Sequence, residues 1–278
     1  MTDVLLANEP AIRLGAFIGV LALMAIWEAA SPRRQRDIPR AIRWANNLGL
    51  VVLDTLILRF VFPVLAVGTA VIAAERGWGL LNLTGLPGWV AVLAAIFLLD
   101  LAVYAQHVLF HAVPVFWRLH RVHHADLDFD VTTALRFHPL EIVLSMLIKL
   151  AVVVLLGAPA VAVMIFEVLL NATAMFNHAN LRLPAAVDGA LRRVFVTPDM
   201  HRIHHSVRRE ETNSNYGFNL SVWDRLFGTY RDQPREGHEG MTIGIEQFRT
   251  LRDLWLDRML AQPFRGPASA ELADREPR

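Results

Sequence analysis

Histidine is the residue type in this sequence whose number and spacing best suit chemistry. The chain contains 11 histidines, and most of them fall in three regularly spaced clusters. One cluster has the pattern HxxxH and two have the pattern HxxHH; the members are His107 and His111, then His120, His123 and His124, then His201, His204 and His205. Residues three and four apart share one face of a helix, so each cluster directs several imidazoles at one point. This arrangement is typical of a metal site built on helices.

The number of imidazoles indicates more than one metal ion. A single zinc takes about four ligands, so these three clusters exceed the needs of one ion and favour a two-metal site. The chain has no cysteine, which excludes Cys-ligated clusters, Cys-based zinc fingers and disulfides. Imidazole suits zinc, copper, iron and nickel alike. Because apolar segments that could hold a lipid chain lie next to the clusters, we expect oxygen chemistry on C–H bonds and therefore two iron ions.

Long apolar segments must position these histidines. Hydrophobic residues make up 54% of the chain, and apolar stretches occupy about residues 14–29, 48–74 and 89–104. Another apolar region, 142–176, is broken by Gly157, Ala158 and Pro159, which favour a turn over a continued helix. About 20 apolar residues cross a bilayer, so we expect three spanning helices followed by a broken helical hairpin that spans or re-enters.

The distribution of arginine predicts the orientation in the membrane. A short segment after the first apolar stretch carries Arg33, Arg34, Arg36, Arg40 and Arg43, and such loops lie on the cytoplasmic side. The hairpin must return the chain to the side it left if all clusters share one site, and the basic residues after it agree. We expect an integral protein of a bacterial inner or plasma membrane, with the amino terminus outside and the metal site on the cytoplasmic face. The net charge of +1 gives no sign of nucleic-acid binding.

These elements define an expected architecture. The fold class is an all-α, polytopic membrane protein with a cytoplasmic helical cap that carries a histidine-rich di-metal site. Residues 1–99 would form the amino-terminal membrane helices, and 100–235 the catalytic core with the hairpin. Residues 236–278 would form an amphipathic segment at about 244–260 and a disordered tail from about residue 262.

The motifs resemble those of the membrane-bound fatty acid hydroxylase and sterol desaturase superfamily. The matching segments are DLAVYAQHVLFH, FWRLHRVHHAD, TALRFHPLE, FNHANLRLP, TPDMHRIHH and NYGFNLSVWDRLFGTY, which together span about residues 100–230. The resemblance implies a histidine-ligated di-iron centre that activates O₂ with electrons from a separate donor, a ferredoxin- or cytochrome-type redox chain. It also implies that the substrate is a lipid, which is hydroxylated or desaturated.

The resemblance also implies a ligand set. It assigns the eight clustered histidines as metal ligands and adds His178 as a ninth, at the exit of the hairpin. His138 in RFHPLE could ligate, bond to a carboxylate, or cap the following helix. Some family members carry a histidine pair where this chain has Asn171 and Thr173, which would leave one metal with fewer nitrogens.

Polar residues near the ligands are candidates to orient the imidazoles. Asp100 and Tyr104 share one helical face with His107 and His111, so either could accept the second ring proton of a ligand. An arginine partner for Asp100, such as Arg118 or Arg121, is the alternative. Other candidates with less support are Asp126, Glu141, Asp199 and Asn180.

Three functions remain open from the sequence. The first is an oxygenase that oxidises a C–H bond of a sterol, fatty acyl or isoprenoid lipid with O₂ and external electrons. The second is a membrane hydrolase in which two zincs activate water, and it would need neither oxygen nor electrons. The third is a metal carrier or sensor, which the placement of all clusters on one side of the membrane disfavours.

Overall fold

The computed structural model describes residues 2–266 as an assembly of helices. Among these residues there is no strand, only three isolated bridges. The helices of the first half are α1 (Thr2–Ala7), α2 (Glu9–Ala30), α3 (Arg40–Val61), α4 (Ala66–Glu75), α5 (Leu80–Leu83), α6 (Gly88–Ala112), α7 (Pro114–His124) and the 3₁₀ turn η1 (Val131–Leu135). Those of the second half are α8 (Pro139–Leu156), α9 (Ala160–His178), α10 (Ala185–Leu191), α11 (Pro198–His204), α12 (Arg209–Thr212), α13 (Val222–Leu226), α14 (Gly237–Gly240), η2 (Leu251–Leu254), α15 (Leu256–Ala261) and η3 (Gln262–Phe264). The all-α fold class is thereby confirmed.

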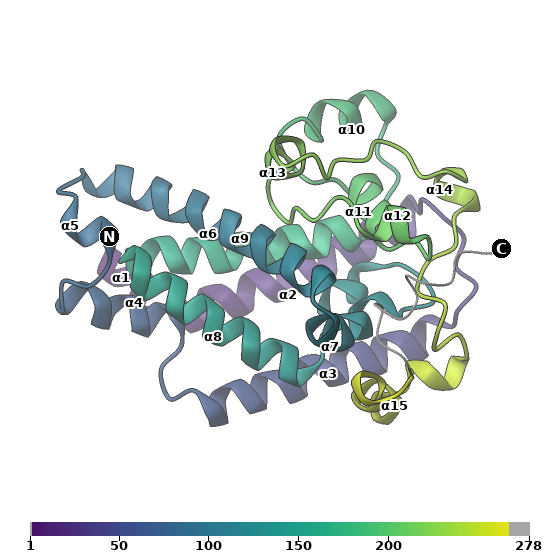
Figure 1. Cartoon of the computed structure of the whole chain (residues 1–278), viewed down its shortest axis with the longest axis horizontal. Helices are drawn as coiled ribbons and strands as arrows, with labels where there is room; N and C mark the ends of the chain where they lie inside the picture. The colour runs from purple at the N-terminus through teal and green to yellow at the C-terminus, as the bar shows by residue number, and fades with distance from the viewer. Residues whose placement is uncertain (1, 267–278) are drawn as a thin grey trace.

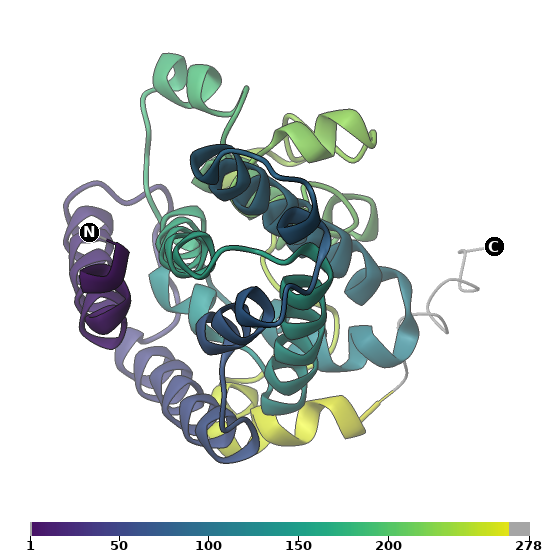
Figure 2. The same ribbon diagram turned by 90° about the vertical axis from the view of Figure 1, so that its left-hand side faces the viewer.

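The long helices form a bundle, and the short helices of the second half, α10 to α15, gather at one end of it (Figure 1). We call residues 179–266, which contain the short helices α10 to α15, the cap. Seen end-on, α9 lies in the middle of the bundle and packs against α2, α4 and α6 (Figure 2). The α1 helix and α5 lie at the end opposite the cap (Figure 1). The bundle therefore has one end with short connections and one end that carries the cap.

Five helical segments within residues 2–266 are long and apolar enough to cross a membrane. They are Glu9–Ala30, Arg40–Leu83, Gly88–Ala112, Pro139–Leu156 and Ala160–His178. Helices α8 and α9 have 18 and 19 residues, or about 27 and 29 Å at 1.5 Å per residue. The two helices are connected at Gly157, whose backbone is left-handed (φ 63°). Gly157 also packs closely against the α4–α5 turn, because a Cβ atom added to it would lie 2.6 Å from the Trp78 carbonyl oxygen. The hairpin therefore reaches the same end of the bundle as α5.

One expectation about helix continuity is wrong. The apolar stretch 48–74 is two helices, because α3 ends at Val61 and the chain turns through Pro63 before α4 begins. The amphipathic segment 244–260 begins without helix. Gly244 and Phe248 both have positive φ values, 107° and 60°, and helix resumes only at η2 and α15.

The expected disordered tail is corrected over its first residues. Gln262 and Pro263 are buried in the turn η3, which packs against α7. The Arg121 guanidinium of α7 donates to the backbone oxygens of Gln262 and Arg265. The rest of the expected tail, 267–278, lies outside the described residues.

Candidate metal centre

Nine of the histidines lie together where the bundle meets the cap. They come from α6, α7, α9 and α11, with His205 directly after α11, and each is less than 9% exposed. Their nitrogens form two groups whose candidate ligand atoms lie within 4.8 Å of one another: His107, His111, His120, His124 and His204 in group one, and His123, His178, His201 and His205 in group two. The helical spacing accounts for this division, since each HxxHH cluster contributes to both groups.

In group one the backbone and side chains around the rings fix the position of the ring proton. His107 Nδ1 lies 2.7 Å from the Tyr216 carbonyl oxygen, and His204 Nδ1 lies 2.8 Å from that of Ser214. A carbonyl oxygen only accepts, so each Nδ1 carries the proton and each Nε2 a lone pair. Yet these two Nε2 atoms are only 3.0 Å apart, and His107 Nε2 is 3.1 Å from His120 Nε2. Lone pairs brought this close repel one another, and a cation between them would remove the repulsion.

Group two repeats the arrangement around His178. Its Nδ1 lies 2.7 Å from the Ala174 carbonyl oxygen one turn earlier in α9, which again leaves the lone pair on Nε2. That Nε2 is 3.1 Å from the Nε2 atoms of three other rings, those of His123, His201 and His205. Four imidazoles therefore converge on one point.

Burial keeps the histidines neutral, as metal ligands must be. The pKa values of the six histidines outside the membrane helices lie well below the ordinary value, chiefly because burial disfavours the charged ring and secondly because neighbouring histidines would repel it; they are His120, His123, His124, His201, His204 and His205. Within the groups, both nitrogens of His124 and Nε2 of His111 are buried without a hydrogen-bond partner. An unpaired buried polar group costs about 1–3 kcal/mol. The donor set thus fits two metal ions, one for each group.

Comparisons with known proteins agree with this geometry. The sequence model of the fatty acid hydroxylase family matches residues 92–229, a range that contains all nine histidines. The chain belongs to the fatty acid hydroxylase family. It is 30% identical over 187 residues to an ornithine lipid hydroxylase of Rhizobium tropici, across 67% of this chain and 54% of that protein. It is 28% identical to an alkylglycerol monooxygenase of Homo sapiens, over 55% of this chain and 33% of that protein.

A fatty acid hydroxylase of a Lecanicillium species is 28% identical over 159 residues, across 52% of this chain and 43% of that protein. These matches therefore span between a third and about half of the relatives' own lengths. No solved structure matches the chain.

Glu141 orients His120, one of the histidines of group one. Its Oε1 accepts a hydrogen bond of 2.6 Å from His120 Nδ1, which directs the His120 Nε2 lone pair into group one. Glu141 is in the first turn of α8, so this bond also ties the hairpin to α7. The sequence placed it among the candidates with less support. Asn213, whose Oδ1 lies 3.3 Å from His111 Nδ1, was missed.

Replacing Glu141 with leucine is expected to weaken metal binding at group one by about 10- to 100-fold, because such partners of ligand histidines contribute on this scale. The measurement is metal content per chain during titration with a chelator. Group two, which does not contact Glu141, serves as the internal control and should keep its metal. Equal retention of both metals at every chelator concentration would contradict the assignment.

The other predicted orienting residues bond elsewhere. Asp100 accepts hydrogen bonds from Asn219 and from Trp223, and no arginine among residues 2–266 bonds to it. The Tyr104 hydroxyl bonds to Thr229, and the Asn180 side chain bonds to the backbone of Arg34. None of the hydrogen bonds found for these three residues reaches a ligand histidine.

His138 also lies outside both groups. Its Nδ1 accepts a hydrogen bond from the backbone N–H of Leu140, and its Nε2 donates to the Leu260 carbonyl oxygen. Of the three roles that the sequence left open, the structure shows the helix cap, at the start of α8.

A buried ion-pair cluster holds the end of the second histidine cluster against α3. Arg43 is fully buried and bonds to both carboxylate oxygens of Asp126, at 2.9 and 2.8 Å, and to Asp130 at 2.5 Å. Burial alone would raise the pKa of Asp126, but the Arg43 guanidinium outweighs it and lowers the pKa to about 2. Asp126 follows His124 by two residues, so Arg43 fixes where α7 ends.

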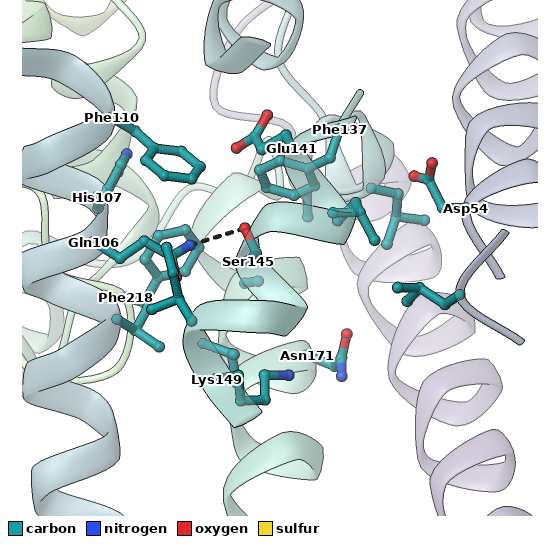
Figure 3. A pocket seen from close by; sticks show the side chains of 18 of the residues that line it. Asp54, Gln106, His107, Phe110, Phe137, Glu141, Ser145, Lys149, Asn171 and Phe218 are labelled. Atoms are coloured by element: carbon teal, nitrogen blue, oxygen red, sulfur yellow. Dashed lines mark hydrogen bonds between the residues drawn. The ribbon is translucent and has the colours of Figure 1, made fainter. Parts of the chain in front are cut away.

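An apolar cavity of about 300 Å³ opens next to group one. Its lining includes His107 and His120, while Leu99, Val103 and Ile148 are among its apolar walls. Figure 3 shows His107, Phe110 and Glu141 toward one end of this cavity and Lys149 and Asn171 toward the other. The Gln106 amide donates a hydrogen bond of 2.9 Å to Ser145 across it. The cavity runs from group one into the long apolar helices.

Proposed function

We propose that this chain is a membrane-bound di-iron oxygenase that oxidises a C–H bond of a lipid with O₂ and external electrons. The observation that carries the proposal is the contact between two features: a pair of converging imidazole groups, and an apolar cavity whose lining includes two ligands of group one. A cavity among membrane helices suits a lipid chain, because its walls are mostly hydrophobic. The names of the relatives, lipid hydroxylases and a monooxygenase, agree with this reading.

The chain's own residues would hold the metals and prepare the site. The nine histidines of the two groups would ligate the irons, which supply, when bound, the reduction of O₂ and the oxidation of the C–H bond. Backbone carbonyls of Ser214 and Tyr216 hold protons on the Nδ1 atoms of His204 and His107, so that the lone pairs face inward. Phe110 and Phe137 line the cavity and exclude water beside His120.

Charge distribution supports a cytoplasmic metal centre. The arginine-rich segment between α2 and α3 and the arginines after the hairpin lie at the cap end of the bundle, whereas α1 and the α4–α5 turn lie at the other end (Figure 1). By the positive-inside rule, the cap would face the cytoplasm and the amino terminus the outside. A separate electron donor, of ferredoxin or cytochrome type, would then reach the metals from the cap side.

The proposal is tested on the full chain purified in lipid nanodiscs. We expect about two irons per chain and O₂ consumption that requires a chemical or protein reductant. Comparing the lipids of cells with and without the protein should show a product with one added oxygen atom, or with two hydrogen atoms fewer. Lipid turnover that continues without O₂ and reductant would contradict the oxygenase and support the zinc hydrolase.

A further inference from the structure

Asp54 is an unpaired carboxyl group inside the membrane part of the bundle. It lies in α3, lines the apolar cavity, and is 7% exposed. Its Oδ1 is buried without a hydrogen-bond partner, and no hydrogen bond or ion pair to Asp54 is found among residues 2–266. An ionisable side chain in a membrane helix is costly, and it marks a functional site unless it is paired.

The other buried carboxyl groups of the long helices all have partners. The partners are guanidinium and ammonium groups, amides, an indole or an imidazole: Glu28 bonds to Arg36 and Arg40, Asp100 to Asn219 and Trp223, Glu141 to His120, and Glu167 to Lys149 and Arg13. The fold thus supplies a partner at each of these positions and none for Asp54. This contrast indicates that the partner of Asp54 comes from outside the chain.

The position of Asp54 restricts what that partner is. Asp54 shares the cavity lining with His107 and His120, and Figure 3 shows it on the side of the cavity opposite His107. A molecule that reaches Asp54 therefore lies next to the metal groups. Leu58 and Val152 belong to the same lining and suit a hydrocarbon chain. The occupant is then an amphiphile with one polar group within reach of Asp54.

The chemistry of a carboxyl group selects a hydrogen-bond donor. An ionised carboxylate only accepts, and a protonated one still offers an accepting carbonyl oxygen. A hydroxyl or ammonium group therefore satisfies Asp54 in either state, whereas an ether or ester oxygen satisfies only the protonated form.

We propose that Asp54 accepts a hydrogen bond from a hydroxyl or ammonium group of the lipid substrate and so positions the oxidised carbon beside group one. The substrate class is thereby a lipid that carries a hydrogen-bond donor on the side of the cavity opposite His107, rather than a plain acyl chain. This inference rests on the proposed function, in which the cavity is the substrate site. Asp54 acts as a positioning residue, since it touches the substrate away from the reacting atoms.

The test measures binding without turnover. The full chain in nanodiscs, kept free of O₂ and reductant, binds tritiated dodecan-1-ol in competition with unlabelled dodecan-1-ol, dodecylamine or 1-methoxydodecane, which has no donor. In the wild type, held at a pH high enough to ionise Asp54, we expect the methyl ether to bind about tenfold more weakly than the alcohol. In Asp54→Leu the alcohol should fall to the affinity of the ether, while the affinity of the ether itself stays unchanged and reports an intact cavity.

Two further variants keep the test decisive. Asp54→Asn keeps an accepting oxygen and adds an N–H donor, so it should bind the alcohol and the ether alike, the preference being lost because the ether binds more tightly. Thr55→Val is the matched control, because Thr55 also lines the cavity but already donates to the Val51 carbonyl oxygen. It should leave the preference unchanged. Dodecylamine distinguishes the two donors. If the wild type binds it more tightly than the alcohol and Asp54→Asn does not, the donor is an ammonium group. Otherwise the donor is a hydroxyl.

Equal binding of alcohol and ether by the wild type would overturn the inference, and so would a preference that persists in Asp54→Leu. Failure of the proposed function has a different signature, namely no O₂ consumption with reductant while the preference for a donor remains. If Asp54→Leu does not fold, the wild-type comparison of alcohol with ether still decides.

Discussion

Replacing His123 and His204 together with alanine is expected to remove both metals and to lower lipid oxidation by at least about 100-fold. The two residues belong to different groups, so each group loses one converging nitrogen. Loss of a side chain that hydrogen-bonds to a metal ligand already lowers metal affinity or activity by about 10- to 100-fold. Loss of the ligand itself should lower both further. Metal content per chain and O₂ consumption with reductant measure the effect. Each single variant should lose metal from its own group first.

The matched control is the double variant His138→Ala/His238→Ala. It removes the same number of histidines, and neither residue belongs to a group. His138 caps α8, and His238 is 3.6 Å from Asp199, so we expect a loss of stability of about 1–2 kcal/mol with both metals retained. Metal retained by His123→Ala/His204→Ala, or lost only from the control, would contradict the assignment of the two groups.

The largest expected effect on stability belongs to Arg43. Replacing it with alanine leaves the carboxylates of Asp126 and Asp130 buried without their guanidinium partner. Breaking a buried pair in this way costs about 3–5 kcal/mol. Denaturant unfolding of the detergent-solubilised protein measures the change. We also expect weaker metal binding, because Asp126 lies two residues beyond His124 and holds the end of α7 in place.

Arg40 provides the control on the same helix. Its guanidinium is 3.4 Å from Glu28, and its side chain is 37% exposed. The Glu28 carboxylate is buried, but without Arg40 it still has Arg36 and the backbone N–H groups of Val131 and Asn180 as partners. Arg40→Ala should therefore cost only about 0–1 kcal/mol and unfold nearly as the wild type does. If Arg40→Ala and Arg43→Ala destabilise the protein equally, the effect would come from helix α3 as a whole and not from the buried cluster.

The metal groups were largely predictable because they depend on local spacing. In α7, His120 and His124 are one turn apart, and His123 lies at the side of that face, which is why one motif supplies both groups. The spacing shows which imidazoles share a face of one helix. It does not show which nitrogens of distant segments meet, so the division into five and four came only from the structure.

The partners of the imidazoles were less predictable, for a physical reason. Ser214 and Tyr216 act through backbone carbonyl oxygens, which every residue has, so side-chain identity carries no signal. Asp100 and Tyr104 share the helical face of the ligands, but the cap residues Trp223 and Thr229 pack close enough to take their hydrogen bonds.

Helix ends were predicted well where glycine and proline stand together. Gly157 and Pro159 mark the turn of the hairpin, and the structure confirms it. In the second apolar stretch, 48–74, Pro63 interrupts the apolar residues, but the hydrophobicity on both sides of it favoured a single helix. Hydropathy reports burial in lipid or protein, and it does not distinguish one helix from two.

The two imidazole groups join parts of the chain that are far apart in sequence, such as His107 and His204, which are 97 residues apart. An ion bound by both of these histidines would therefore act as a reversible cross-link between the membrane bundle and the cap. By mass action, a ligand present at 1,000 times its dissociation constant stabilises the folded state by about 4 kcal/mol. On the proposed function, metal supply would set the lifetime of the protein as well as its activity, and a cell starved of metal would hold less of the protein, in an inactive form.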